Sequence, residues 1–412
     1  MLSARGWIVL GSGILLWIAA RMVGSPSLHI VAVGVTILPV IAWAFVMVTR
    51  HRLAVVRRLS ATKVPLGQRL SVDLEIENRS TTTTSFVLVE DKVPASLGRP
   101  ARLVLTGLPG RNSQRVRYHV TCRSRGHFSI GPLTLSLQDP FALTRIRLDY
   151  SGRDLVVVFP EVENLDHGLP SPFGAGAGHS LTRHLLPAGE EFYTMREYQL
   201  GDDLRRIHWR SVARRGRLMI RQDEASRRGT SVLFLDTRAS ALGLSGEPGF
   251  ERAVSAAAST GVLMSRSGFT VRLATPETKP TAMTEDRLLE LLAAVSHTHS
   301  SSLAQALVPL RSVAGVDSTL VVVTAPPGPK EIATLTRVGS AFGPKLVILV
   351  YPVEPGALPP EGGPQLEGRA SVARQSLVRA GWEVIVLSPS EKLKDLWHTN
   401  RTRALAPIGS SR

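Results

Sequence analysis

The chain has 412 residues, of which 43% are hydrophobic and 20% are charged, and it contains one cysteine, Cys122. This apolar content excludes a wholly disordered chain, and the length predicts two or three domains. A single cysteine excludes an internal disulfide, and the sequence has no array of Cys and His for a structural zinc. The formal net charge of +16 is compatible with an anionic partner but does not identify one. Of the 49 basic residues, 42 are arginine.

Two apolar runs open the chain. Residues 7–23 and 28–48 contain no acidic residue, and Arg21 is the only charge inside either run. A membrane-spanning helix needs about 17–25 apolar residues, so we predict two transmembrane helices joined by a short turn within residues 1–50. The alternatives are a cleaved signal peptide or a membrane-surface helix for the first run, and a buried core helix for either.

Arginine residues flank these runs unevenly. Arg5 precedes the first run, and the second is followed by Arg50, Arg52, Arg57 and Arg58. The positive-inside rule therefore predicts an inner-membrane protein with both termini and the soluble domains in the cytoplasm. Residues 7–48 would contact membrane lipid, and the arginines of 50–58 would lie against anionic headgroups.

Residues 53–160 have the pattern of a β-sandwich. Apolar and polar residues alternate over 70–77, 115–120 and 133–137, and turn residues such as Gly67 separate these segments. Alternation predicts strands with one buried face, and several short strands of this kind predict an antiparallel sandwich.

Residues 161–229 are predicted to be a linker followed by a dense charged motif. The linker part, 168–178, is rich in Gly, Pro and Ser. The motif then reads Gly189-Glu-Glu-Phe192, Arg196-Glu-Tyr198, Gly201-Asp-Asp-Leu-Arg-Arg-Ile-His-Trp209 and Ala213-Arg214. Its pattern predicts a strand ending near Gln199 and, after a turn at Gly201, a helix with Asp202 or Asp203 at its N-cap.

This motif permits two roles. Arginine binds carboxylates or phosphates through paired hydrogen bonds, so the motif can bind an acidic partner or can form an internal clasp between domains. The candidate residues for either role are Glu191, Arg196, Tyr198, Gly201, Asp202, Asp203, Arg206, Trp209 and Arg214. Within the expected helix, Trp209 is predicted to be a packed anchor and His208 a core histidine.

Residues 230–400 alternate between strands and helices. Strands are predicted at 231–235, 270–274, 320–324, 345–351 and 383–387, and helices at 251–267, 285–296, 330–338 and 371–380. Continuous apolar strands between helices predict a Rossmann-like α/β domain with a mostly parallel sheet, whose ligands bind at the carboxyl ends of the strands. Residues 401–412 are a tail.

Three stretches resemble the bacterial domain of unknown function 58 (DUF58) family. They are Arg125–Leu133, Asp139-Pro-Phe-Ala-Leu143 and the charged motif, with Ala142 where the family usually has Gly and Val212 where relatives often have Ser. The resemblance implies a membrane-anchored protein with a von Willebrand factor type A-like domain, encoded near a MoxR-type AAA+ ATPase and a transglutaminase-like membrane protein. It implies no particular chemical activity.

The end of the first α/β strand carries Asp236-Thr-Arg-Ala-Ser240, which resembles the metal-ion-dependent adhesion site of type A domains, Asp-x-Ser-x-Ser. Asp236 and Ser240 match this pattern, but Arg238 replaces the middle Ser, and Thr324 ends a later strand where an acidic residue is usual. Since a hard divalent ion needs several oxygen ligands, we expect no stable Mg²⁺ site and no other cofactor.

The sequence contains no nucleophile elbow, zinc-protease motif, Walker A sequence or dinucleotide fingerprint, so no catalytic residue is predicted and an enzyme is not favoured. We expect a membrane-anchored, cytosol-facing protein-interaction adaptor or assembly factor that works with a MoxR-type ATPase and other membrane proteins. The alternatives are an envelope-associated hydrolase and a module that binds anionic lipid or nucleic acid. No specific nucleic acid is expected as a partner, since no reader module is recognised.

Overall fold

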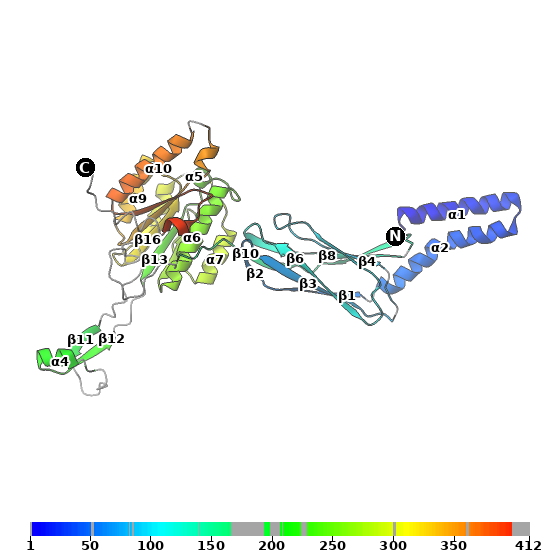
Figure 1. Ribbon diagram of the computed structural model, residues 1–412, viewed down its shortest axis with the longest axis horizontal. Helices are drawn as coiled ribbons and strands as arrows, with labels where there is room; N and C mark the ends of the chain where they lie inside the picture. The colour runs from blue at the N-terminus through cyan, green and yellow to red at the C-terminus, as the bar shows by residue number, and fades with distance from the viewer. Residues whose placement is uncertain are drawn as a thin grey trace, which may run out of the picture. The chain divides into compact units, whose positions relative to one another are not determined.

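The computed structural model describes residues 2–50, 53–81, 83–84, 86–139, 141–165, 193–197, 207, 209–223, 229–299, 302–359 and 362–397. The chain divides into two units, Met1–Phe159 and Pro160–Arg412, which are treated separately below. Two apolar helices open the chain, and several β-sheets and further helices follow them (Figure 1). The protein is therefore a mixed α/β protein with more than one domain.

The two opening helices are α1 (Ala4–Val23) and α2 (Pro26–Arg50). The spans Ala4–Val23 and Pro26–Met47 are long and apolar enough to cross a membrane. Only 17% and 22% of their most apolar windows are buried in the protein, which argues against a buried core helix for either. Ser3 caps α1 by accepting a hydrogen bond from the Gly6 N–H at 3.1 Å, and Gly24 ends it with a φ of 73°.

Small side chains let the two helices approach closely. Gly6, Gly13 and Ala20 are the buried residues of α1 and lie seven positions apart, on one side of the helix. A Cβ atom at Gly13 would lie 2.5 Å from the Oγ1 atom of Thr36 in α2. Close backbone contact through small residues is how helices gain packing energy in lipid, where the hydrophobic effect between them is lost.

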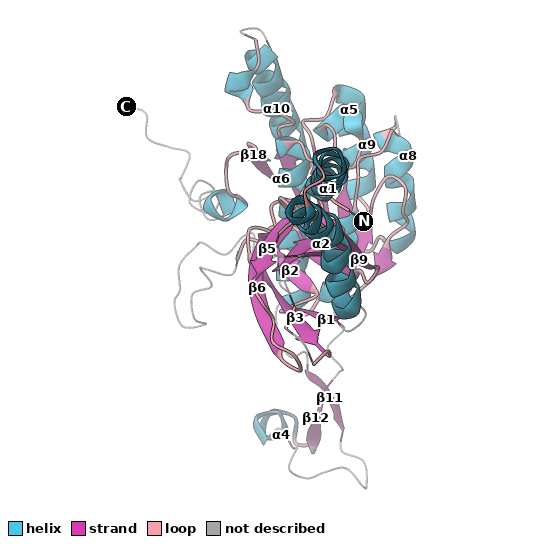
Figure 2. Ribbon diagram, turned by 90° about the vertical axis from the view of Figure 1, so that its right-hand side faces the viewer, coloured by secondary structure: helices cyan, strands magenta, loops and turns pink. Residues whose placement is uncertain are grey.

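Three small sheets follow in the first unit, and their strands are drawn in magenta in Figure 2. The first contains β1 (Leu53–Leu59), β3 (Arg69–Asn78) and β6 (Ser113–Thr121). The second contains β2 (Lys63–Pro65), β10 (Asp154–Phe159) and β7 (Gly126–Ile130). The third contains β5 (Ala101–Leu105), β4 (Phe86–Asp91), β8 (Leu133–Gln138) and β9 (Arg145–Tyr150).

One hydrophobic cluster joins residues from all three sheets. The predicted alternation is clear in β3, where Leu70, Val72, Leu74 and Ile76 are fully buried. The strands predicted at 70–77, 115–120 and 133–137 are confirmed to within two residues. The pairing of β2 with β10 is parallel, whereas the sequence predicted antiparallel pairing throughout.

Arg57 of β1 connects the three sheets. Its guanidinium donates to both carboxylate oxygens of Asp91 in β4, at 2.7 and 3.0 Å, and to Asp154 of β10 at 2.9 Å. The Tyr118 hydroxyl of β6 donates to Asp91 at 2.7 Å, and burial together with this carboxylate raises the pKa of Tyr118. The expectation that Arg57 lies against lipid headgroups is wrong, because its side chain is 7% exposed and both its partners are internal.

This arginine also explains part of the first DUF58-like stretch. Gly131 has a φ of 111°, and a Cβ atom there would lie 3.0 Å from the nearer guanidinium nitrogen of Arg57. The carbonyl oxygens of Ile130 and Gly152 accept from the same guanidinium at 3.1 Å each. Gly131 is therefore needed for backbone conformation and for room beside a buried charge.

The second DUF58-like stretch holds the start of α1. Asp139 accepts hydrogen bonds from the N–H groups of Phe141 and Thr144 and from the Thr144 hydroxyl, which fixes a tight loop. Ala142 in this loop has a φ of 57°, a conformation that suits Gly better, and this accounts for the Gly that relatives usually carry there. The loop's carbonyl groups bind Ser3: Leu143 O accepts from its N–H at 2.8 Å and Ala142 O from its hydroxyl at 2.6 Å.

The second unit contains a six-stranded sheet of order β15-β14-β13-β16-β17-β18. Its parallel strands are β13 (Thr230–Leu235), β14 (Thr270–Ala274), β16 (Ser318–Thr324), β17 (Lys345–Val350) and β18 (Glu383–Leu387). The edge strand β15 (Thr281–Ala282) pairs antiparallel with β14 and was not predicted.

Helices cover both faces of this sheet (Figure 1). Its helical elements are α5 (Ala239–Leu242), α6 (Pro248–Arg266), α7 (Glu285–Ala294), α8 (Leu303–Leu307), η2 (Val308–Val313), α9 (Pro329–Gly339), η3 (Pro355–Ala357) and α10 (Gly362–Arg379). Leu233 of β13 contacts the α6 side at Gly261, whereas its neighbours Val232 and Phe234 share a core with α8, α9 and α10. The predicted strands agree with the structure, but α10 begins nine residues before its predicted start and α8 was missed.

The residues that follow β10 are fixed to the second unit. Glu163 accepts a hydrogen bond from Arg252 of α6 at 2.8 Å and one from the Lys394 N–H at 2.9 Å. Its own N–H donates to the Ser259 hydroxyl at 2.8 Å. The first residues of the predicted linker, 161–165, are therefore part of the α/β unit.

Replacing Arg57 with Ala is expected to lower the free energy of unfolding of the first unit by about 3–5 kcal/mol, because Asp91 would stay buried without its counter-charge. Arg58→Ala is the matched control, since this neighbour in β1 is 68% exposed and its loss is expected to cost less than about 1 kcal/mol. Pulse proteolysis of the full chain across a urea series measures both variants. Equal losses would contradict a central role for Arg57.

Glu383 begins β18, where desolvation raises its pKa to about 7 from its ordinary value of 4.5. The folded state therefore binds the proton more tightly than the unfolded state, so this group stabilises the fold below about pH 4.5 and loses that contribution as the pH rises through about 7. Glu383→Gln is expected to raise the Tm at pH 8 relative to the parent chain and to leave it unchanged near pH 4.5. Thermal unfolding at the two pH values tests this, and a parallel shift at both would exclude it.

Candidate functional site

The candidate site lies at the carboxyl ends of the two central strands β13 and β16. Asp236 follows β13 directly and is fully buried, and Thr324 is the last residue of β16. The Thr324 hydroxyl donates to Oδ2 of Asp236 at 2.7 Å, and the Asp236 N–H donates to the Val323 carbonyl at 2.9 Å. Parallel pairing of the two strands places these groups side by side.

The Arg238 guanidinium occupies the space next to Asp236. Its Nε and Nη2 atoms donate to the two carboxylate oxygens of Asp236 at 2.9 and 2.8 Å, and its backbone N–H donates to Oδ1 at 3.1 Å. Burial alone would lower the pKa of Arg238. Its hydrogen bonds and charge contacts with Asp236 and Glu331 outweigh this effect, so the pKa is raised and the group stays charged. Two parallel N–H···O bonds are the strongest geometry for this pair.

A second carboxylate completes the cluster. Glu331, in the first turn of α9, accepts from Nη1 of Arg238 at 2.8 Å through Oε1 and from the Gly328 N–H at 2.9 Å through Oε2. A carboxylate at a helix N-terminus is also favoured by the helix dipole. Arg238 therefore links the end of β13 to the start of α9, and a Gly-Pro-x-Glu capping pattern at 328–331 was the sequence signal that could have identified Glu331.

Ser240, the other residue that matches the adhesion-site pattern, is exposed on α5. Among the described residues, no group of three or more His, Cys, Asp or Glu side chains could hold a metal ion. The cation that Asp236 binds is supplied by the chain itself, in the form of the Arg238 guanidinium. The residues at this strand end therefore do not fit a divalent metal ion.

Most of the charged motif lies outside the described residues, including Glu191, Tyr198, Gly201, Asp202, Asp203, Arg206 and His208. Arg196 lies in β11 (Tyr193–Glu197), which pairs antiparallel with β12 (Met219–Asp223) so that Arg196 is opposite Ile220. The strand predicted to end near Gln199 is present as β11, whereas its antiparallel partner β12 was not predicted.

The helix of this motif begins later than predicted. Ile207 has β-bridge geometry and is 9% exposed, and α4 spans Trp209–Arg215. Trp209 is 67% exposed, so the prediction of a packed anchor is wrong. Ala213, four residues further along α4, and Arg214 are exposed too. The short helix α4 therefore presents an aromatic ring and an arginine to solvent.

Residues 194–378 match the family model described as "Protein of unknown function DUF58". This match supports the DUF58 family. It contains both α4 and the strand-end cluster around Asp236, whereas the DUF58-like stretches at 125–133 and 139–143 lie outside it. No curated protein matches the sequence.

Three solved structures each resemble a part of the chain. The CARDB domain of the PF1109 protein from Pyrococcus furiosus is 10% identical, covers 26% of this chain and 91% of its own, and has a TM-score of 0.21. The DNA glycosylase AlkC of Pseudomonas fluorescens is 12% identical and covers 32% of this chain and 38% of its own, with a TM-score of 0.18. The C-terminal domain of wzt is 7% identical and covers 28% and 80%, with a TM-score of 0.20. These scores carry no argument about fold or function.

Replacing Arg238 with Ser is expected to make the stability of the α/β unit depend on Mg²⁺. The substitution removes the internal cation and adds a hydroxyl beside Asp236 and Thr324, so a magnesium ion at about 5 mM should stabilise this variant by about 1–2 kcal/mol. Arg238→Met is the control, because it removes the same charge without adding an oxygen. Thermal unfolding with and without Mg²⁺ measures both, and the idea fails if the two variants respond alike.

Proposed function

We propose that the chain is a membrane-anchored, cytosol-facing protein-interaction adaptor or assembly factor. The observation that carries this proposal is the 67% exposure of Trp209 on α4, within the segment that matches the DUF58 family. Trp and Arg are the residues that most often dominate the binding energy of protein interfaces, and Arg214 is exposed on the same short helix. We take Trp209, Ala213 and Arg214 as the partner-binding patch.

The state of Asp236 favours a binding function over the alternative of a hydrolase. Both its carboxylate oxygens accept hydrogen bonds from Arg238, and Oδ2 also accepts from Thr324. A carboxylate held in this way is a poor general base, because any substrate would have to displace a buried bidentate ion pair. In the structure this strand end therefore acts as a fixed support for α9.

The α/β unit is further proposed to be a von Willebrand factor type A-like domain in which a guanidinium replaces the metal ion. Support comes from the position of Asp236 after a central parallel strand and from the contact of its carboxylate with the next strand at Thr324. The preceding β-rich region is proposed to be a sandwich, since residues of its three sheets share one hydrophobic cluster.

The start of α1 supports two intact membrane spans, and Arg5 at this end supports the proposed cytoplasmic orientation. Ser3 donates to the carbonyls of Ala142 and Leu143, so the N-terminal end of the hairpin lies on the same side as the β-rich region. Cleavage of the first helix as a signal peptide would remove these contacts. Arg5, at the same end, fits the positive-inside rule.

The partner we propose is a MoxR-type AAA+ ATPase, together with other membrane proteins. A photo-crosslinking amino acid placed at Ala213 in intact cells is expected to capture this ATPase, which mass spectrometry would identify. Adding Trp209→Ala to the same chain should reduce the yield at least tenfold, because truncation of a Trp at an interface centre commonly costs about 2 kcal/mol or more.

The matched control places the same crosslinker at Val316, which is 85% exposed in the α/β unit and lies outside α4. It should capture no ATPase. If position 213 also yields none, or if the yield is unaffected by the loss of Trp209, the adaptor proposal is refuted.

A further inference from the structure

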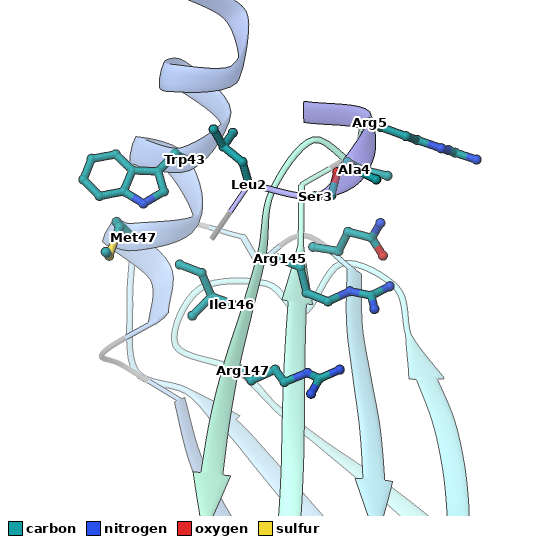
Figure 3. A pocket seen from close by; sticks show the side chains of 11 residues that line it. Leu2, Ser3, Ala4, Arg5, Trp43, Met47, Arg145, Ile146 and Arg147 are labelled. Atoms are coloured by element: carbon teal, nitrogen blue, oxygen red, sulfur yellow. Dashed lines mark hydrogen bonds between the residues drawn. The ribbon is translucent and has the colours of Figure 1, made fainter. Parts of the chain in front are cut away.

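An open cavity of about 1040 Å³ lies where the apolar helices meet β8 and β9. Its walls come from the start of α1, the end of α2 and the membrane-proximal ends of the two strands (Figure 3). The residues that the argument uses are Arg5, Trp43, Met47, Arg145, Ile146 and Arg147. No Asp or Glu is among the lining residues.

The cavity has a charged side and an apolar side. Arg5 of α1 and Arg145 and Arg147 of β9 are exposed, and in Figure 3 their side chains extend in the same direction. Trp43 and Met47 of α2 extend to the other side, where Ile146 also points. The three arginines that line the cavity favour an anionic ligand, and the side chains of Trp43 and Met47 favour hydrocarbon.

The position of the cavity at the ends of the two apolar helices favours a lipid phosphate over a soluble phosphate. Met47 is the last residue of the span Pro26–Met47, and Ala4, the first residue of the other span, also lines the cavity. This is the level of the lipid headgroups, where Trp is enriched and where phosphate groups of the bilayer are found. A soluble phosphate would use the arginines but would leave the apolar side without a partner.

The backbone holds this arrangement in place. Leu2 forms a β-bridge with Thr144, next to Arg145, and Ser3 is bound to the 142–143 carbonyls. Arg5 is therefore fixed beside β9, although the two segments are about 140 residues apart in sequence. Preorganisation of this kind lowers the entropy lost when a ligand binds.

We propose that this cavity binds one anionic glycerophospholipid, with its phosphate held by Arg5, Arg145 and Arg147 and its acyl chains along the apolar side. The proposal rests on the membrane anchoring proposed above. It adds a specific lipid site, which joins the bilayer to the β-rich region at a defined point.

The test uses the full chain in detergent micelles, to which phosphatidylglycerol or phosphatidylcholine is added, and native mass spectrometry counts retained lipid. The parent chain is expected to retain one phosphatidylglycerol and to release phosphatidylcholine. The double variant Arg5→Gln with Arg147→Gln should bind phosphatidylglycerol about 30-fold more weakly, since each arginine near an anionic surface contributes a factor of about five.

The control is Arg69→Gln with Arg123→Gln, which removes the same charge from two exposed residues. Arg69 begins β3, whose other end, Asn78, pairs with Leu53 next to α2, so it lies away from the cavity. This control should bind phosphatidylglycerol as the parent chain does. Equal weakening in both double variants would overturn the proposal, as it would indicate attraction by net charge alone.

Two further measurements separate the possible failures. If inorganic phosphate at millimolar concentration displaces the lipid as well as phosphatidylglycerol headgroups do, the ligand is a soluble anion and the lipid assignment is overturned. Flotation of the parent chain with liposomes tests anchoring separately. A chain that fails to float refutes the membrane proposal, whereas one that floats but retains lipid equally in all variants refutes only the lipid site.

Discussion

The pairing of Arg238 with Asp236 is the interaction on which the centre of the α/β unit depends. Asp236 is fully buried at the end of a central strand, and a buried carboxylate needs a counter-charge and hydrogen-bond donors. Arg238, two residues along the chain, supplies both, and it also donates a hydrogen bond to Glu331 at the start of α9. The helix is thereby tied to the strand end through side chains that would otherwise attract a solvated cation.

The β-rich region uses the same physical solution. Arg57 neutralises the buried Asp91 and also contacts Asp154, and in doing so it connects strands of three separate sheets. In each region one buried arginine neutralises a buried aspartate through two hydrogen bonds and also contacts a second carboxylate. The high arginine content of the chain is therefore partly structural, because Arg57 and Arg238 form buried ion pairs within the protein.

The helices and strands with a regular apolar pattern could be predicted from the sequence, because buried positions are occupied by apolar residues at the spacing of the element. The alternation of β3 and the continuous apolar run of β16 each have one physical explanation, and both elements are where the pattern indicates. The two apolar helices were likewise evident from length and composition. The elements that were missed are short, such as β15 and α8, or begin with Gly and Pro, as α10 does.

Side-chain partnerships were much harder to predict. The sequence shows Arg238 at the usual position of a metal ligand. The capping pattern marks Glu331 at a helix start, but nothing in the sequence pairs it with Arg238, which is 93 residues away. Arg57 looked like a membrane-flanking charge, since nothing nearby in sequence shows that Asp91 and Asp154 surround it. Trp209 looked like a core residue by its type alone, and its exposure depends on a helix that starts later than local capping signals indicated.

The bridge between Leu2 and Thr144 has a consequence for the order of assembly during synthesis. The hairpin leaves the ribosome first, whereas the loop that receives its amino end is made about 140 residues later, which is about 7–28 s at ordinary elongation rates. The amino end of α1 is therefore made long before its partners in the loop, and it lacks these contacts during that interval. Docking of the β-rich region against that end is then a late step, which cannot occur before the loop at 142–144 has been made.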